Sequence, residues 1–251
     1  MTTHTHRLTG LVTGLAVTGI LISIAGDLQG ALIFPKPPDG AQALAATNLS
    51  SRAQQNARAA ERTQISKRGR VQTSQLTNVA ELTFAFPHRN YVNVAGWLQG
   101  VPLSTAVSSN AWRWQFLLLK GTNAVGAARV APVGETGRSM QVSIEESPIQ
   151  ESPLLPRILR AIRVAEALPQ VKQRDYEVRH LDMYPPIAFD ALWLHAESED
   201  IFLPIPPPPV PDNPGEDLGG LKAYQPCSEA QLLEVLRPRV RTVDPSSGLG
   251  S

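Results

Sequence analysis

The stretch Asp175–Ile205, DYEVRHLDMYPPIAFDALWLHAESEDIFLPI, decides the fold that the sequence predicts. It contains three runs rich in aromatic and branched apolar residues, at 175–184, 187–196 and 200–205. Such short runs between turn signals are typical of β-strands. Pro185 and Pro186 predict a tight turn after the first run, and a short acidic break separates the second run from the third. The stretch therefore predicts three consecutive strands of an antiparallel sheet.

The histidines and acids of this stretch do not predict a metal site. A two-residue turn at 185–186 would pair residue 180 with residue 191, which places His180 and His195 on one face but four residues apart. At ~3.3 Å per residue the separation is roughly 13 Å, whereas two donors on one zinc ion lie ~4 Å apart or closer. We therefore expect no metal at His180, Asp182 and His195.

The acidic break carries Glu197, Glu199 and Asp200 at the tip between two apolar strands. Two carboxylates perform general acid–base chemistry only when a cleft buries one of them, and a short turn supplies no cleft. We predict a solvated turn at this tip. The prolines at 206–209 cannot donate hydrogen bonds to a neighbouring strand, so they are expected to end the third strand.

The part of this stretch from Tyr176 to Ile205 resembles a segment found in a family of bacterial proteins of unknown function. The shared pattern is an E-V-R strand, a turn, then A-L-W-L and an acidic break. It covers about an eighth of the chain and contains no catalytic residues. The resemblance implies the hairpin and no chemistry.

Upstream segments have the same composition as these strands. They are Val79–Phe86, Tyr91–Gly100, Trp112–Gly121, Val125–Ala131 and Ser139–Glu145. Pro87 is expected to end the first of them, and the polar residues that follow it predict a hairpin between the first two. Together with the three later strands, these segments predict a meander-like antiparallel sheet.

One internal helix is predicted at 152–168, SPLLPRILRAIRVAEAL. Its apolar residues recur three and four positions apart, which is the spacing of one helix face. They are Leu154, Leu155, Ile158, Leu159, Ile162 and Leu168. We expect the helix to lie across the sheet. The predicted fold is α+β, with an antiparallel sheet packed by one amphipathic helix in a globular domain at 76–210.

Residues 8–26, LTGLVTGLAVTGILISIAG, form an uncharged apolar run preceded by Arg7. A helix of this length spans about 28 Å, close to the ~30 Å hydrocarbon core of a bilayer, so residues 1–26 could be a membrane anchor. The small residues up to Ala25 favour a signal peptide with cleavage after Ala25. The anchor stays open as the alternative, and both interpretations place the rest of the chain outside the cytoplasm. A third alternative is a cytosolic protein whose apolar N-terminus packs elsewhere. We expect an exported, envelope-associated protein.

The two flanks of the predicted domain look different from it. Residues 27–75 are rich in Ala, Gln and Arg and have only a thin apolar stripe, so we expect a linker that is a marginal helix or a flexible tether. Residues 211–251 are a Pro/Gly-rich tail with a short helix at 229–237. Ser228 and Gln231 predict a capping box at the start of this helix, and Pro238 predicts its end.

The composition narrows the classes of function. Lys and Arg number 23 and Asp and Glu 22, a net charge of +1, so nucleic acid is not an expected partner. The chain has one cysteine, and it contains no phosphate loop, GxGxxG, GxSxG, HExxH or paired CxxC, so no cofactor is predicted. We favour a non-catalytic binding or interaction module with a protein partner in the cell envelope.

Two alternatives stay open. The first is a small-ligand-binding domain that uses an aromatic sheet face with Trp112, Trp114 and Trp193, because ring faces can hold sugars or cations. The second is an enzyme with an unrecognised site. His88, His180 and His195 would be its first residues to test.

Overall fold

The computed structural model of the chain describes residues 30–65, 79–92, 95–107, 112–133, 139–146, 154–183, 189–207 and 218–241. The apolar run at 8–26 and the turn at Pro185 and Pro186 lie outside these ranges. Within the described ranges, no helix is both long and apolar enough to cross a membrane.

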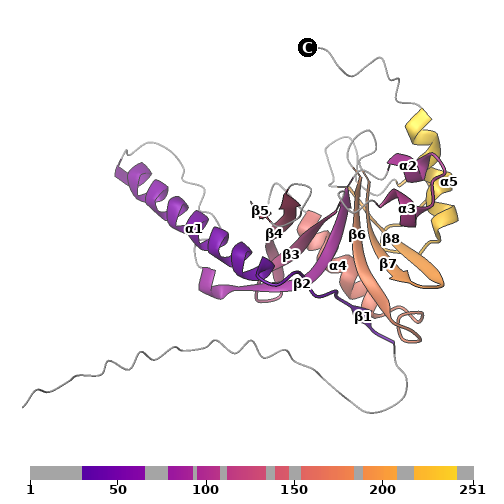
Figure 1. Cartoon of the computed structure of the whole chain (residues 1–251), viewed down its shortest axis with the longest axis horizontal. Helices are drawn as coiled ribbons and strands as arrows, with labels where there is room; N and C mark the ends of the chain where they lie inside the picture. The colour runs from indigo at the N-terminus through magenta and orange to yellow at the C-terminus, as the bar shows by residue number, and fades with distance from the viewer. Residues whose placement is uncertain are drawn as a thin grey trace, which may run out of the picture.

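The fold is α+β, as predicted, and its sheet is mostly antiparallel (Figure 1). Seven strands follow the order β5-β4-β3-β2-β6-β7-β8, and β1 pairs with β6. The strands are β1 (Leu32–Ile33), β2 (Leu82–Val92), β3 (Trp112–Lys120), β4 (Asn123–Val133), β5 (Ser139–Glu146), β6 (Tyr176–Met183), β7 (Phe189–Ala196) and β8 (Glu199–Ile205). The sheet is not one meander. Two antiparallel meanders are joined by a parallel pairing of β2 with β6.

The predicted hairpin between 79–86 and 91–100 is wrong, because β2 continues through Pro87. The pairing of β2 with β3 shifts between Ala85 and His88, which is a bulge, and Phe86 has φ 51°. A bulge leaves its extra residues out of the hydrogen-bond ladder, so a proline is tolerated there. The sequence after the strand instead forms the short helix α2 (Ala95–Leu98).

The predicted register of β6 and β7 is wrong by one residue. Met183 pairs with Phe189, and His180 therefore lies opposite Leu192 rather than opposite residue 191. Because side chains alternate between the two faces of a strand, this shift puts His180 and His195 on opposite faces of the sheet.

The helix predicted at 152–168 is α4 (Leu154–Glu166), and it packs across the sheet as expected. It connects β5, at one edge, to β6 in the middle. Leu155, Ile158 and Ile162 are fully buried against Val178 and Leu192. We call the side of the sheet that α4 covers the α4 face.

Residues 30–65 of the expected linker are part of the fold. Helix α1 (Ala41–Ile65) covers β3–β5 on the opposite face, where Ala41, Ala45 and Leu49 pack with Phe116. The thin apolar stripe is sufficient because small alanines let the helix approach the sheet closely. The second half of α1 projects beyond the sheet (Figure 1).

The start of the described chain is also anchored, through β1. This strand pairs in parallel with the first residues of β6. Further along β6, β2 takes over as the parallel neighbour. Gly30 precedes it and lies against the backbone of Arg174, where any Cβ would clash. A glycine is therefore required at this close approach.

Residues 218–241 of the expected tail are likewise part of the fold. Helix α5 (Glu229–Arg241) starts with the predicted capping box, in which the amide of Gln231 bonds Ser228 Oγ and the amide of Ser228 bonds Gln231 Oε1. Its Leu232 and Leu236 are buried in a cluster with α2, the short helix α3 (Leu103–Ala106) and β6–β8. Pro238 does not end the helix, which continues to Arg241.

Candidate functional site

Polar side chains gather on one part of the α4 face. Three neighbouring strands each place two polar residues on this face by alternation. They are His88 and Asn90 on β2, Arg113 and Gln115 on β3, and His180 and Asp182 on β6. The register brings them together, because His88 lies opposite Gln115 and Asn90 lies beside His180. With Arg129 of β4, Glu145 of β5 and Asp190 of β7, they form what we call the polar cluster.

The cluster has a buried floor and a charged rim. His88, Asn90, Gln115 and His180 are 0% exposed. The side chains of the charged members are partly exposed, from 15% for Asp182 to 30% for Arg113.

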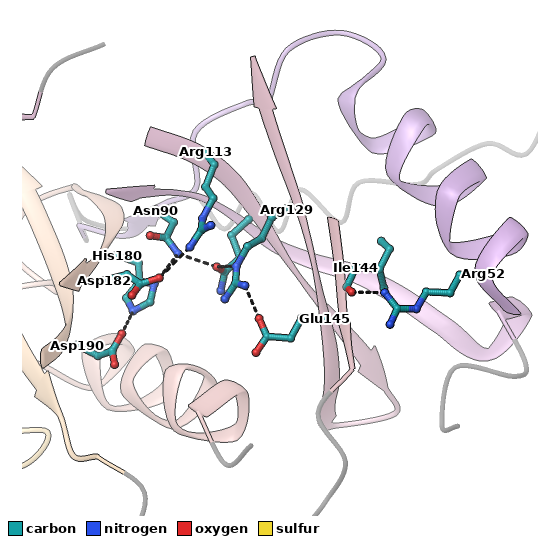
Figure 2. Close-up of polar contacts among 10 residues, drawn as sticks. Arg52, Asn90, Arg113, Arg129, Ile144, Glu145, His180, Asp182 and Asp190 are labelled. Carbon is teal, nitrogen blue, oxygen red and sulfur yellow. Dashed lines mark hydrogen bonds and ion pairs between the residues drawn. The ribbon is translucent and has the colours of Figure 1, made fainter. Parts of the chain in front are cut away.

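Hydrogen bonds and one ion pair connect cluster members on β2, β3, β4, β5 and β6 (Figure 2). Asn90 Nδ2 donates to Gln115 Oε1 at 2.9 Å and to Asp182 Oδ2 at 3.3 Å. Arg113 donates to the same Asp182 oxygen at 3.0 Å. Arg129 donates to Gln115 Oε1 at 3.0 Å and pairs with Glu145. These contacts fix the side chains of the floor in one arrangement.

The histidines complete the floor. His180 Nε2 lies 3.1 Å from Asp190 Oδ1, and His88 Nδ1 lies 2.6 Å from the carbonyl oxygen of Phe86. The two rings meet edge to face with centroids 6.1 Å apart. Burial, His180 and Arg129 together lower the pKa of His88 from 6.5 to about 3, although the Phe86 carbonyl raises it. His88 is therefore neutral at physiological pH.

The charges of the rim are balanced in pairs. Burial alone would raise the pKa of Asp182, but His180, the hydrogen bond from Asn90, and Arg113 and Arg129 hold it below its usual value. Burial and the neighbouring Arg129 lower the pKa of Arg113, which Asp182 partly offsets. Asp182 is thus ionised, and it neutralises Arg113 as Glu145 neutralises Arg129.

Several buried atoms of the cluster have no hydrogen-bond partner within the described residues. They are His88 Nε2, Asn90 Oδ1, Arg113 Nε, Gln115 Nε2 and His180 Nδ1, and Glu145 Oε2 has only its ion pair with Arg129. A buried polar atom left without a partner is unfavourable by about 1–3 kcal/mol, so such atoms are rare in folded proteins. Their concentration in one place marks this cluster as the candidate site.

The tryptophans of the aromatic-face hypothesis lie elsewhere. Trp114 and Trp193 are 4% and 1% exposed and belong to different apolar clusters on the face opposite α4. Trp193 stacks on Phe202 and lies under the Arg179 guanidinium, 4.6 Å from the ring centroid. The side chain of Trp112 lies outside the description. The two described rings are parts of the core, and they form no shared platform.

The structure separates the three histidines. His88 and His180 belong to the polar cluster, whereas His195 is on the opposite face, where its Nδ1 lies 2.7 Å from Asp200. Asp200 also accepts a hydrogen bond from Trp193, so the acidic tip is not simply solvated. Within the described ranges, no group of three His, Cys, Asp or Glu side chains is placed to hold a metal.

The sequence contained a signal for this cluster that strand composition alone does not reveal. In β2, β3 and β6 two polar residues occur at alternate positions on a strand face that is otherwise mostly apolar. Such pairs interrupt the pattern expected for a face that a helix covers.

No family model matches the chain, and no curated protein and no solved structure matches it significantly.

Proposed function

We propose that the protein is a non-catalytic binding module whose polar cluster holds a small polar molecule. The observation that supports this is the set of buried, unpartnered nitrogen and oxygen atoms on one patch of the α4 face. Ligand sites combine an apolar setting with a few fixed polar groups, and a ligand that bonds those groups removes the penalty of burying them. The aromatic-face alternative has no comparable support.

The first test is retention of a ligand. Purified full-length protein is dialysed against a cell extract, and the molecules that it retains are measured by mass spectrometry. Gln115→Met keeps the side-chain volume but removes both polar atoms of Gln115, so we expect retention to fall roughly tenfold or more. His195→Gln changes a histidine on the opposite face and should retain as much as the wild type. Equal retention by Gln115→Met would contradict the proposal.

A second candidate function rests on one contact. Asp190 bonds Nε2 of His180, and a carboxylate that orients an imidazole in this way leaves the other nitrogen ready to take a proton. The enzyme alternative would use His180 as such a base. The retained molecule distinguishes the two functions, since a binding module returns it unchanged and an enzyme converts it during incubation.

We also propose that the protein is exported and acts in the cell envelope, where it could meet a protein partner. Support comes from the apolar run at 8–26, and the location is tested by fractionation with mass spectrometry of the N-terminus. A chain beginning at Gly26 in the soluble exported fraction would identify a cleaved signal peptide. An intact N-terminus in the membrane fraction would identify an anchor. Recovery only from the cytosol would contradict export.

A further inference from the structure

The partners of each side chain determine which atoms of the polar cluster can donate and which can accept. A guanidinium only donates, so the Gln115 atom that meets Arg129 is its oxygen, and the free atom is the NH₂ group. A carboxylate only accepts, so the Asn90 atom that meets Asp182 is its nitrogen, and the free atom is the carbonyl oxygen. The cluster therefore presents an amide donor beside an amide acceptor.

The same reasoning applies to the His88 ring. The Phe86 carbonyl only accepts, so His88 Nδ1 carries the proton. Because the ring is neutral, its unpartnered Nε2 has a lone pair and accepts. A carboxylate only accepts, so His180 Nε2 carries a proton and donates to Asp190. The unpartnered atoms thus include two acceptors, His88 Nε2 and Asn90 Oδ1. They also include two donors, Gln115 Nε2 and Arg113 Nε.

An anion fits this arrangement poorly. Arg113 and Arg129 are already paired with Asp182 and Glu145, so the cluster has no uncompensated positive charge to attract one. A carboxylate or phosphate oxygen also brings no proton for His88 Nε2 or Asn90 Oδ1, and both acceptors would stay unpartnered. A group with N–H or O–H donors next to a carbonyl oxygen would satisfy acceptors and donors together.

We propose that the ligand of the polar cluster is an uncharged molecule with a carboxamide-like group, whose N–H bonds reach His88 and Asn90 and whose carbonyl oxygen reaches Gln115 and Arg113. This inference rests on the proposed binding function and names its ligand class. The ligand is selected by the pattern of hydrogen-bond donors and acceptors and not by net charge, as when the edges of two nucleic-acid bases pair.

The test compares two isosteric probes, propionamide and propionate, on the full-length protein in mild detergent. Long-range ¹H–¹⁵N spectra of the histidine rings report contact with His88 Nε2, and titration gives the affinities. We expect propionamide to shift the His88 signal and to bind at least roughly tenfold more tightly than propionate, because the anion leaves buried acceptors unpaired.

A charge-matched pair of variants sharpens the comparison. Gln115→Glu keeps an oxygen for Arg129 and replaces the NH₂ donor with an acceptor, so the preference for propionamide should disappear. Gln141→Glu makes the same change at an exposed position of β5 and should leave the preference intact. Retained preference in Gln115→Glu would overturn the inference.

The outcomes separate this inference from the proposed function. Tighter binding of propionate at His88, or an anion as the molecule retained from the extract, would overturn the ligand class and leave the binding function standing. If neither probe moves the signals of His88 and His180 and the extract yields no retained molecule, both are wrong.

Discussion

Trp193→Ala should lower the free energy of unfolding by about 3–5 kcal/mol, the usual effect of removing a large buried aromatic side chain. Trp193 is fully buried between Tyr91 and Phe202, with ring centroids 5.5 Å and 6.1 Å away. The Arg179 guanidinium lies over the ring, and the indole N–H of Trp193 donates to Asp200 at 2.8 Å. Truncation would leave a cavity at the junction of β6, β7 and β8. Urea denaturation of full-length protein measures the change.

Trp193→Phe is the matched control for this prediction. It keeps an aromatic ring against Phe202 and loses mainly the N–H bond to Asp200, so the expected loss is about 1 kcal/mol. Asp200 would still have His195 as a partner. Because the ring is on the face opposite the polar cluster, ligand retention should be unchanged. Loss of ligand in a folded Trp193→Phe protein would restore the aromatic-face hypothesis.

Local patterns in the sequence predicted much of the fold correctly. The spacing of apolar residues in α4 and the reciprocal contacts of Ser228 and Gln231 depend on residues within one or two helical turns, so both could be predicted from the sequence. The hairpin of β7 and β8 was predictable for the same reason, since a two-residue tip separates Ala196 from Glu199.

Non-local pairing could not be predicted in this way. The parallel contact of β2 with β6 joins residues about ninety positions apart, and no local pattern encodes it. The bulge at Pro87 makes one strand from a segment that looks like two. Helix α1 has few large apolar residues, and its stability depends on contacts with β4 and β5 that its own composition does not reveal.

The candidate site depended on those same pairings. His88, Arg113 and His180 come from three separated segments, and they become neighbours only when β2 lies between β3 and β6. The one-residue error in the register of β6 and β7 had a further effect. It associated His180 with the face of His195, and so it hid the contact of His180 with Asp190. A small error in register thus concealed the site.

Lowering the pH from about 6.5 toward 3 should destabilise the protein through His88, by up to about 1.4 kcal/mol for each pH unit. The His88 imidazole has a pKa of about 3 in the folded protein, chiefly because it is buried, against 6.5 when exposed. Between these values the unfolded chain binds a proton that the folded protein does not, so acid favours unfolding.

His88→Gln removes the titrating ring and keeps a donor for the Phe86 carbonyl. We expect urea unfolding measured from pH 7 to pH 4 to show a shallower decline for this variant than for the wild type. The difference between the two profiles isolates His88, because every other titrating group is shared. Parallel profiles would mean that His88 already takes up a proton in the folded protein, and its Nε2 would then be a donor rather than the acceptor on which the proposed ligand class depends.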